Sequence, residues 1–371
     1  MSTLRTVFRR EPVLITAALA ALISCFLIPP DGEYLHYIDW RTLALLYCLM
    51  VAVSGLRRAL LFTHMAHTLC STASSIRVMG IILVGLCFIS SMLMTNDVAL
   101  ITFVPFAVAV MILAGRKREL IWVVVLQTVA ANLGSMLTPM GNPQNLYLYS
   151  FYDLSFRDFV SATLPVWALS GILLILACVL LPGGKITTDL GEEPGLDHRL
   201  LALYLGIFGI CLLCVLRILS WPVMLSAVIA VLLFLDRKTL LKADFMLLLT
   251  FVAFFVFSGN LARLDFADAL LRKMLEGREY ITSLLTSQVI SNVPAALLLS
   301  GFTRQSHALL LGVNVGGLGT PVASLASLIS LKLYSRSSGA DTGRYLLVFT
   351  AVNVLFLALL SAAVFLMGLV P

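Results

Sequence analysis

The chain has 371 residues, of which 60% are hydrophobic and only 12% are charged. Soluble globular domains carry about 25% charged residues, so this composition excludes an ordinary soluble domain and predicts an all-α polytopic membrane protein. The net charge of +6 could indicate a nucleic-acid partner, but the basic residues fall in short loops between apolar runs. We therefore interpret them as topology signals, and we expect the lipid bilayer and no nucleic acid as a partner.

Two membrane spans are predicted at the start of the chain. A bilayer core requires about 20 apolar residues per helix, and the first two such runs lie at about 12–30 and 42–56. Lys and Arg in short loops mark the cytoplasmic side of a membrane. The N-terminus is therefore expected inside because of its basic residues, Arg5, Arg9 and Arg10.

An element that enters the membrane and returns is predicted at about 78–115. Both of its flanks are basic, at Arg77 and at 116–118, so both are expected on the cytoplasmic side. Two ordinary spans with an outside turn would satisfy these charges equally well. A re-entrant hairpin fits better, because the midpoint has no solvent loop and carries three small polar residues, Thr95, Asn96 and Asp97.

A helix with a broken second half is predicted next, at about 119–150. It contains the stretch ANLGSMLTPMGNPQNLYLY at 131–149, with two prolines, two glycines and three asparagines inside an apolar run. A span at about 162–181 follows. A polar loop and a linking helix, together 183–220, then separate this part from the rest of the chain.

The rest of the chain repeats this order of elements. We expect two spans, a second hairpin, a second broken helix and a last span, at about 221–235, 243–259, 280–302, 306–334 and 345–369. The second hairpin has Ser291 and Asn292 at its tip. The count of spans leaves the C-terminus outside.

The two broken helices align without gaps at a shift of 182 positions. The identities are Asn132/Asn314, Gly134/Gly316, Thr138/Thr320, Pro139/Pro321 and Leu146/Leu328. Because one linking span joins the halves, we predict inverted structural repeats, with 1–182 as the first unit and 221–371 as the second. In the alternative interpretation, Pro and Gly only kink the spans, and Ser and Asn only hydrogen-bond neighbouring helices.

The broken stretches indicate a binding site near the membrane midplane. Discontinuous helices in inverted repeats expose backbone carbonyls and half-helix N-termini there. Neutral Asn, Ser and Thr oxygens suit Na⁺, while helix N-termini suit an anion. Asp97 is the one carboxylate predicted deep in the hydrophobic region, where a charge is costly. It either couples transport, by binding Na⁺ or carrying a proton, or caps the following half-helix.

At these motifs the chain resembles the ion transporter superfamily, which includes divalent anion:sodium symporters, arsenite-efflux pumps and a branch of Na⁺/H⁺ antiporters. TNDVAL at 95–100 resembles the family's hairpin tip, and LTPMGNPQN at 137–145 resembles its loop. SNVP at 291–294 with GTPVASLASL at 319–328 is similar to the second-half motifs of the arsenite-pump branch. The resemblance implies a homodimer in which two hairpins and two broken helices slide as a transport domain against a scaffold.

The resemblance also implies two cation sites with the substrate between the tips. The first would use Thr95, Asn96, Asp97, Ser135, Thr138, Gly141, Asn142 and Asn145, with Na⁺ at Asn96, Asp97, Thr138 and Asn142. The mirror site would use Ser291, Asn292, Thr320, Ala323 and Ser324. Val293 and Pro294 replace the Thr of the symporters, which favours the proton- or oxyanion-handling branches over a sodium-coupled dicarboxylate importer.

The sequence thus predicts a secondary active transporter of an anion or small oxyanion, coupled to H⁺ or Na⁺, in a bacterial inner membrane. We expect no enzyme activity, and no cofactor apart from Na⁺ as a coupling ion. A cation/proton antiporter without an organic substrate is the alternative, since Asp97 with neutral oxygens would suffice. A passive channel is a further alternative. Flux through a channel would not depend on a proton or sodium gradient, whereas flux through a coupled transporter would. An intramembrane hydrolase would require a metal cluster or a Ser–His pair, and no His clearly lies in a span beside the motifs.

Overall fold

The computed structural model describes residues 12–185 and 191–370. Seven helices in this part of the chain are long and apolar enough to cross a membrane, and shorter apolar helices accompany them. The chain is therefore an all-α polytopic membrane protein, as its composition predicts. The residues that predict the side of the N-terminus, Arg5, Arg9 and Arg10, lie outside the described residues.

The helices of the first half follow the predicted order of elements, with a short extra helix, α3, after the first span. They are α2 (Pro12–Leu27), α3 (Tyr34–Tyr37), α4 (Trp40–Arg58), α5 (Leu61–Ser71), α6 (Ile76–Ser90), α7 (Asn96–Leu113), α8 (Lys117–Gly134), the 3₁₀ turns η1 (Ser135–Leu137) and η2 (Pro139–Gly141), α9 (Pro143–Phe151) and α10 (Phe156–Val179).

The second half begins with the linking helix α11 (His198–Val215). It continues with α12 (Trp221–Leu235), η3 (Arg237–Lys242), α13 (Phe245–Ala262), α14 (Asp265–Leu275), α15 (Glu279–Ile290), α16 (Asn292–Leu299), η4 (Ser300–Phe302), α17 (Ser306–Val315), α18 (Leu325–Ser335) and α19 (Thr342–Leu366).

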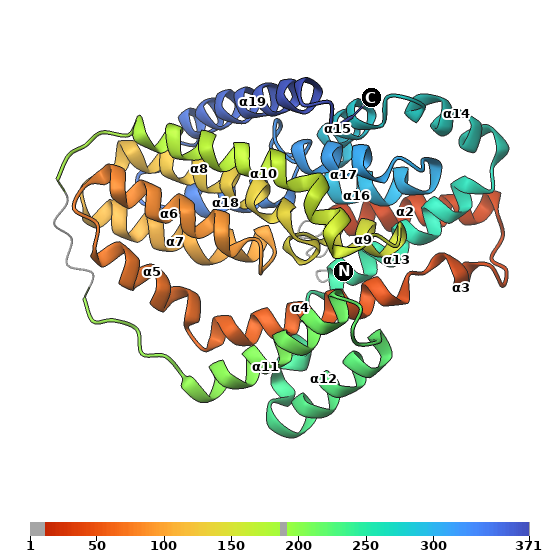
Figure 1. Ribbon diagram of the computed structural model, residues 1–371, viewed down its shortest axis with the longest axis horizontal. Helices are drawn as coiled ribbons and strands as arrows, with labels where there is room; N and C mark the ends of the chain where they lie inside the picture. Colours follow the sequence, from red (N-terminus) through yellow and green to blue (C-terminus); the bar gives the residue numbers. More distant parts are fainter. Residues whose placement is uncertain (1–11, 186–190, 371) are drawn as a thin grey trace, which may run out of the picture.

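The helices form two groups (Figure 1). The two hairpins and the two broken helices, α6–α9 and α15–α18, pack together, and we call them the hairpin body. The frame consists of α2, α4, α11, α12 and α13, in which α2 packs on α13 while α11 and α12 pack on α4. The two groups meet where α4 contacts α9 and where α13 contacts α16.

Packing between the two halves is reciprocal. In the frame, α2 of the first half lies on α13 of the second, and α12 of the second half lies on α4 of the first. In the hairpin body, α18 packs on α7 and α16 packs on α9, so each broken helix contacts the hairpin of the other half. In both groups, therefore, helices of the first half pack directly on helices of the second half.

Two ion pairs in the frame have the same reciprocity. Arg58, the last residue of α4, binds Asp236 beyond α12 at 2.5 Å. Arg263, next after α13, binds Asp31 beyond α2 at 2.8 Å. One shift of 205 positions carries Arg58 onto Arg263 and Asp31 onto Asp236. Each half therefore supplies the arginine of one pair and the aspartate of the other.

Proline and glycine account for the breaks in α8 and α17. After Gly134 the chain passes through η1 and η2, and Pro143 starts α9 as its first residue, where a missing N–H costs nothing. In the second half α17 ends at Val315 and α18 starts at Leu325. Pro143 and Leu325 are separated by the same 182 positions as the aligned motifs.

Each broken helix approaches its own hairpin so closely that only glycine fits. A Cβ on Gly134 would lie 2.0 Å from the Phe88 carbonyl oxygen at the end of α6. A Cβ on Gly316 would lie 2.9 Å from Leu284 Cα in α15. Such contacts are too short for any side chain, which explains why the aligned motifs share this glycine.

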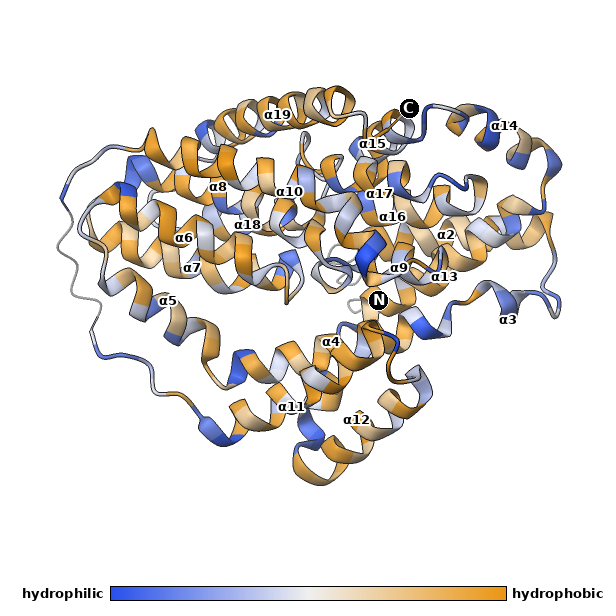
Figure 2. Cartoon of the chain, viewed as in Figure 1, coloured by the Kyte–Doolittle hydropathy of each residue, from blue (hydrophilic) through white to orange (hydrophobic). Residues whose placement is uncertain are grey.

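The outer faces of several helices are apolar, as a lipid-facing surface requires (Figure 2). Ile172, Ile175 and Leu176 on α10 are more than half exposed, at 56–57%. Phe234 at the end of α12 and Leu347 on α19 are also exposed. In water such a surface would promote aggregation, whereas in a bilayer it is matched by the lipid chains.

Candidate functional site

Both hairpin tips reach one small cavity, which lies between the hairpin body and Leu247 of the frame helix α13 and which we call the inter-tip cavity. Its volume is about 10 Å³, close to the space of a single water molecule. Asn96 from the first tip and Asn292 from the second both line it, and they expose 5% and 3% of their surface. Ser324 from the second break lines it as well. Tips that lie far apart in the sequence therefore meet in the protein interior.

Four helices begin at the inter-tip cavity. α7 begins at Asn96, α9 at Pro143, α16 at Asn292 and α18 at Leu325, and all four residues line the cavity. A helix N-terminus presents unpaired N–H groups and about half a positive elementary charge. The convergence therefore suits an anion, and the described residues that line the cavity include no Arg or Lys.

Asn132 connects the first tip to the second break, a role that the sequence did not assign to it. Its Oδ1 atom accepts hydrogen bonds from Asn96 Nδ2 and from Ser324 Oγ, both at 2.9 Å. The available signal was the identity Asn132/Asn314 in the alignment of the two halves. Since Asn96 Oδ1 in turn accepts the Asp97 N–H at 2.9 Å, one chain of bonds crosses between the halves.

The partner asparagine makes a similar connection from the other half. Asn314 Nδ2 donates to Asn145 Oδ1 at 2.7 Å, and Asn145 Nδ2 donates to the Ser135 carbonyl at 3.1 Å. Within the first break, Asn142 Nδ2 donates to Ser135 Oγ at 2.5 Å. Gly141 lies against the same turn, because a Cβ there would be 2.1 Å from the Ser135 oxygen. These predicted residues thus form the hydrogen-bonded first break.

The two aligned threonines, Thr138 and Thr320, form hydrogen bonds with backbone carbonyls of the hairpins, and they do not line the inter-tip cavity. Thr138 Oγ1 donates to the Met92 carbonyl, and Thr320 Oγ1 donates to the Gln288 carbonyl at 3.2 Å. Gln288, which the sequence analysis did not single out, also binds the second break: its amide nitrogen donates to the Gly316 carbonyl at 2.7 Å. Thr320 is itself exposed, so its predicted place in a mirror cation site has no geometric support.

The second tip is a strained turn. Ser291 has φ 75° and ψ 155°, a region that is essentially restricted to glycine. The turn is held by the Ala323 carbonyl, which accepts the Asn292 N–H at 2.9 Å. Ala323 therefore contributes its backbone oxygen, while Ser291 Oγ lies 3.4 Å from the same atom. Strain of this kind persists where the surrounding structure imposes it, and it is common at ligand sites.

Several buried polar atoms around the inter-tip cavity have no protein partner. Gln144, which lines the cavity and is 1% exposed, has neither its amide nitrogen nor its oxygen bonded. Asp97 Oδ1 and Asn142 Oδ1 are also buried without a partner. Leaving such groups unpaired costs about 1–3 kcal/mol each, so they are the atoms expected to bind a solute or water. Gln144 was not among the predicted site residues, although it lies within the LTPMGNPQN motif.

A second carboxylate, Glu279, is also buried inside the protein. Glu279 is 5% exposed, and its Oε2 atom has no partner, while Thr303 Oγ1 lies 3.3 Å from Oε1. Glu279 is the first residue of α15.

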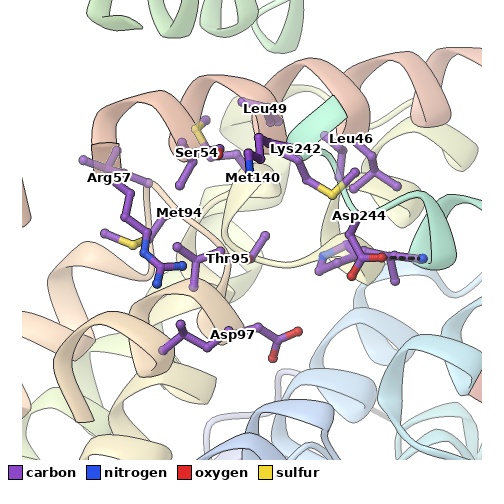
Figure 3. Close-up of a pocket in the computed structure, with 18 of the residues that line it drawn as sticks. Leu46, Leu49, Ser54, Arg57, Met94, Thr95, Asp97, Met140, Lys242 and Asp244 are labelled. Atoms are coloured by element: carbon purple, nitrogen blue, oxygen red, sulfur yellow. Dashed lines mark hydrogen bonds between the residues drawn. The ribbon is translucent and has the colours of Figure 1, made fainter. Parts of the chain in front are cut away.

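A larger cavity of about 240 Å³ adjoins the inter-tip cavity. It lies between α4, the first hairpin tip and the start of α13 (Figure 3). Thr95 lines it, while Asp97, Pro143 and Leu247 line both cavities. Asp97 therefore stands at the junction, between a space large enough for a small solute and the point where the four helices begin.

Comparisons with known proteins relate the chain to membrane transporters. The citrate transporter family model matches residues 6–307. An uncharacterized transporter of Methanocaldococcus jannaschii is 31% identical, over 89% of this chain and 90% of its own. Inner membrane protein YbiR of Escherichia coli is 31% identical, over 80% of each chain. The silicon efflux transporter LSI3 of Oryza sativa is 29% identical, over 45% of this chain and 35% of its own.

Proposed function

The chain belongs to the citrate transporter family and is a membrane transporter, and from that premise we propose that it moves a small anion or oxyanion by secondary active transport. The coupling ion in this proposal is H⁺ or Na⁺. The name of YbiR, an inner membrane protein, supports a bacterial inner membrane as the location.

One observation carries the proposal: the N-termini of α7, α9, α16 and α18 converge on the inter-tip cavity. Their N–H groups and dipoles attract a negative group without a fixed cation. The unpartnered amide of Gln144 adds both a donor and an acceptor at the same place. A hydroxylated oxyanion, which needs both kinds of hydrogen bond, matches this set of groups.

Asp97 supports coupling to a cation. It is the only carboxylate among the described residues that line the inter-tip cavity, and its Oδ1 atom has no hydrogen-bond partner. An ionised carboxylate beside a bound anion would repel it. Binding a proton or a Na⁺ ion at Asp97 removes that repulsion, so that the cation and the anion would bind together. For Na⁺, Asn142 Oδ1 is a further free oxygen nearby.

The arrangement of the two groups of helices supports an elevator-type mechanism in a homodimer. The hairpin body contains all four helix N-termini, while the frame contacts it mainly through α4 and α13. In this proposal the hairpin body moves as a unit past the frame and carries the solute with it. The frame would provide the subunit contact.

The alternative is a cation/proton antiporter, in which Asp97 alone would exchange ions. The unpartnered Asp97 Oδ1 is the observation that favours it. The two proposals differ in whether an anion is needed for ion movement.

The proposal can be tested with purified protein in proteoliposomes. Citrate, phosphate, arsenite and silicic acid are first screened by thermal shift, with and without Na⁺ at two pH values, since a ligand of the folded state raises the melting temperature. Stabilising solutes are then tested for uptake driven by a pH or Na⁺ gradient. Gradient-dependent uptake is the expected result. Uptake that is indifferent to the gradient would indicate a channel, and ion exchange without any solute would indicate the antiporter.

A further inference from the structure

The larger cavity contains two basic side chains that the proposed transport site does not use. Arg57 comes from the last turn of α4, and Lys242 comes from the end of η3. Figure 3 shows both residues on the α4 side of the cavity, and it shows Asp97 on the opposite side. The remaining charged residue in the lining is Asp244.

Asp244 stabilises the start of α13. Its Oδ1 atom accepts the Leu247 N–H at 3.0 Å and so caps the N-terminus of α13. Asp39 caps α4 in the same way, through the Thr42 N–H at 3.0 Å. The shift of 205 positions carries Asp39 onto Asp244, so this acidic residue belongs to the repeated unit.

Arg57 and Lys242 have no comparable structural partner. Neither forms an ion pair with any residue in 12–185 or 191–370, whereas the neighbouring Arg58 is paired with Asp236 at 2.5 Å. Both basic side chains are exposed. Their positive charges are therefore available to a solute that enters the cavity.

The positions of Arg57 and Lys242 also depart from the repeat. The same shift of 205 carries Arg57 onto Ala262 and Tyr37 onto Lys242. Both halves contain the capping aspartate and the ion-paired arginine. Arg57 and Lys242, in contrast, have no basic counterpart at the matching positions of the other half. The matching part of the frame, at Ala262 and Tyr37, therefore forms without these two basic residues, so the fold of the frame does not require them.

We propose that Arg57 and Lys242 form an anion-recruiting site on the α4 side of the larger cavity. They raise the local concentration of small anions and repel cations, so that an anion passes from them to the helix N-termini at the inter-tip cavity. Clefts lined with one sign of charge concentrate ligands of the opposite sign. This inference rests on the proposed function, because it assigns the anion's entry to one face of the same site.

The charge of the cavity can be measured without knowing the substrate. Ser54 lines the cavity one turn before Arg57 on α4 and is partly exposed. In Ser54→Cys, the introduced thiol is labelled in proteoliposomes with an anionic reagent, sulfonatoethyl methanethiosulfonate, or a cationic one, trimethylammonioethyl methanethiosulfonate. Peptide mass spectrometry locates the adduct and separates it from reaction at native cysteines. The rate with the anionic reagent is divided by the rate with the cationic reagent. This ratio does not change when a second substitution alters the reactivity of the thiol toward both reagents equally.

Arg57→Gln or Lys242→Gln in this background is expected to lower the anionic-to-cationic rate ratio by roughly three- to tenfold, because one lost charge slows one reagent and speeds the other. The double variant should lower it further, and Arg57→Lys should preserve it. Lys238→Gln is the matched control, since Lys238 is exposed on the same η3 segment and does not line the cavity.

The outcomes separate this inference from the proposed function. An unchanged ratio in both single variants would overturn the recruiting site, even if gradient-driven anion uptake is observed. An equal fall in Lys238→Gln would do the same, because the effect would then be a general surface charge. A fall confined to the cavity variants would support the site even if transport proved to require no anion. Melting temperatures of all variants verify that each one is folded.

Discussion

The bridge at Asn132 makes a quantitative prediction about how the two halves are joined. Its Oδ1 atom accepts two hydrogen bonds, from Asn96 Nδ2 and Ser324 Oγ, each at 2.9 Å. Asn132→Ala removes this acceptor and leaves both buried donors unpaired. Hydrogen bonds between membrane helices contribute about 0.6 kcal/mol on average and reach about 1.7 kcal/mol. The free energy of unfolding should therefore fall by about 1–3 kcal/mol.

The assay is reversible unfolding in mixed micelles with increasing SDS, followed by circular dichroism. A double-mutant cycle with Ser324→Ala should give a coupling energy of about 0.6 kcal/mol, because the two side chains bond directly. Asn353→Ala is the matched control, since Asn353 is equally buried but donates only to Phe349 within its own helix. Equal losses in the Asn132 and Asn353 variants, with no coupling to Ser324, would refute the bridge.

Three other substitutions separate function from folding. Asp97→Asn is expected to abolish gradient-driven uptake in proteoliposomes without loss of the folded protein on size exclusion; undiminished uptake would contradict the coupling role. Gln144→Leu should weaken solute binding in thermal-shift titrations by about ten- to a hundredfold while leaving the melting temperature unchanged or higher, because its amide has no protein partner to lose. Gly134→Ala should cost about 1–3 kcal/mol in SDS unfolding, since its methyl would meet the Phe88 oxygen at 2.0 Å, whereas Gly85→Ala, with nothing within 4 Å, should be neutral or stabilising.

The sequence predicts the helices and their breaks well because both depend on local chemistry. Apolar runs give the spans, so the segment expected at about 42–56 is α4, Trp40–Arg58. Proline and glycine give the interruptions, and α9 begins at Pro143 inside the predicted broken stretch. The polar tips also start helices: Thr95 and Ser291, residue types that are favoured at the N-cap position, directly precede α7 and α16.

The sequence cannot predict which polar side chains meet, because partners on different helices are set by tertiary packing. Thr138 and Thr320 align in the two halves, but their hydroxyls bind hairpin carbonyls and do not line the inter-tip cavity. Asn132 bonds across the halves to Ser324. Its identity with Asn314 marks the position, but the sequence does not indicate which side chain it contacts. Glu279 is buried at the first residue of α15, and its burial depends on packing against other elements, which composition does not encode.

The two halves contribute differently to the inter-tip cavity. A shift of 196 positions carries Asn96 onto Asn292 and Asp97 onto Val293, so the tips share the asparagine and differ in the carboxylate. The shift of 182 carries Gln144 onto Ala326. Both halves thus supply helix N-termini and polar side chains to the cavity, but its one carboxylate among the described residues and the unpartnered amide of Gln144 come from the first half. In the proposed mechanism, two similar units would allow two conformations of similar energy, and a cation bound at Asp97 would distinguish the loaded form from the empty one. Under that proposal, coupling depends on the difference between the two tips as much as on their similarity.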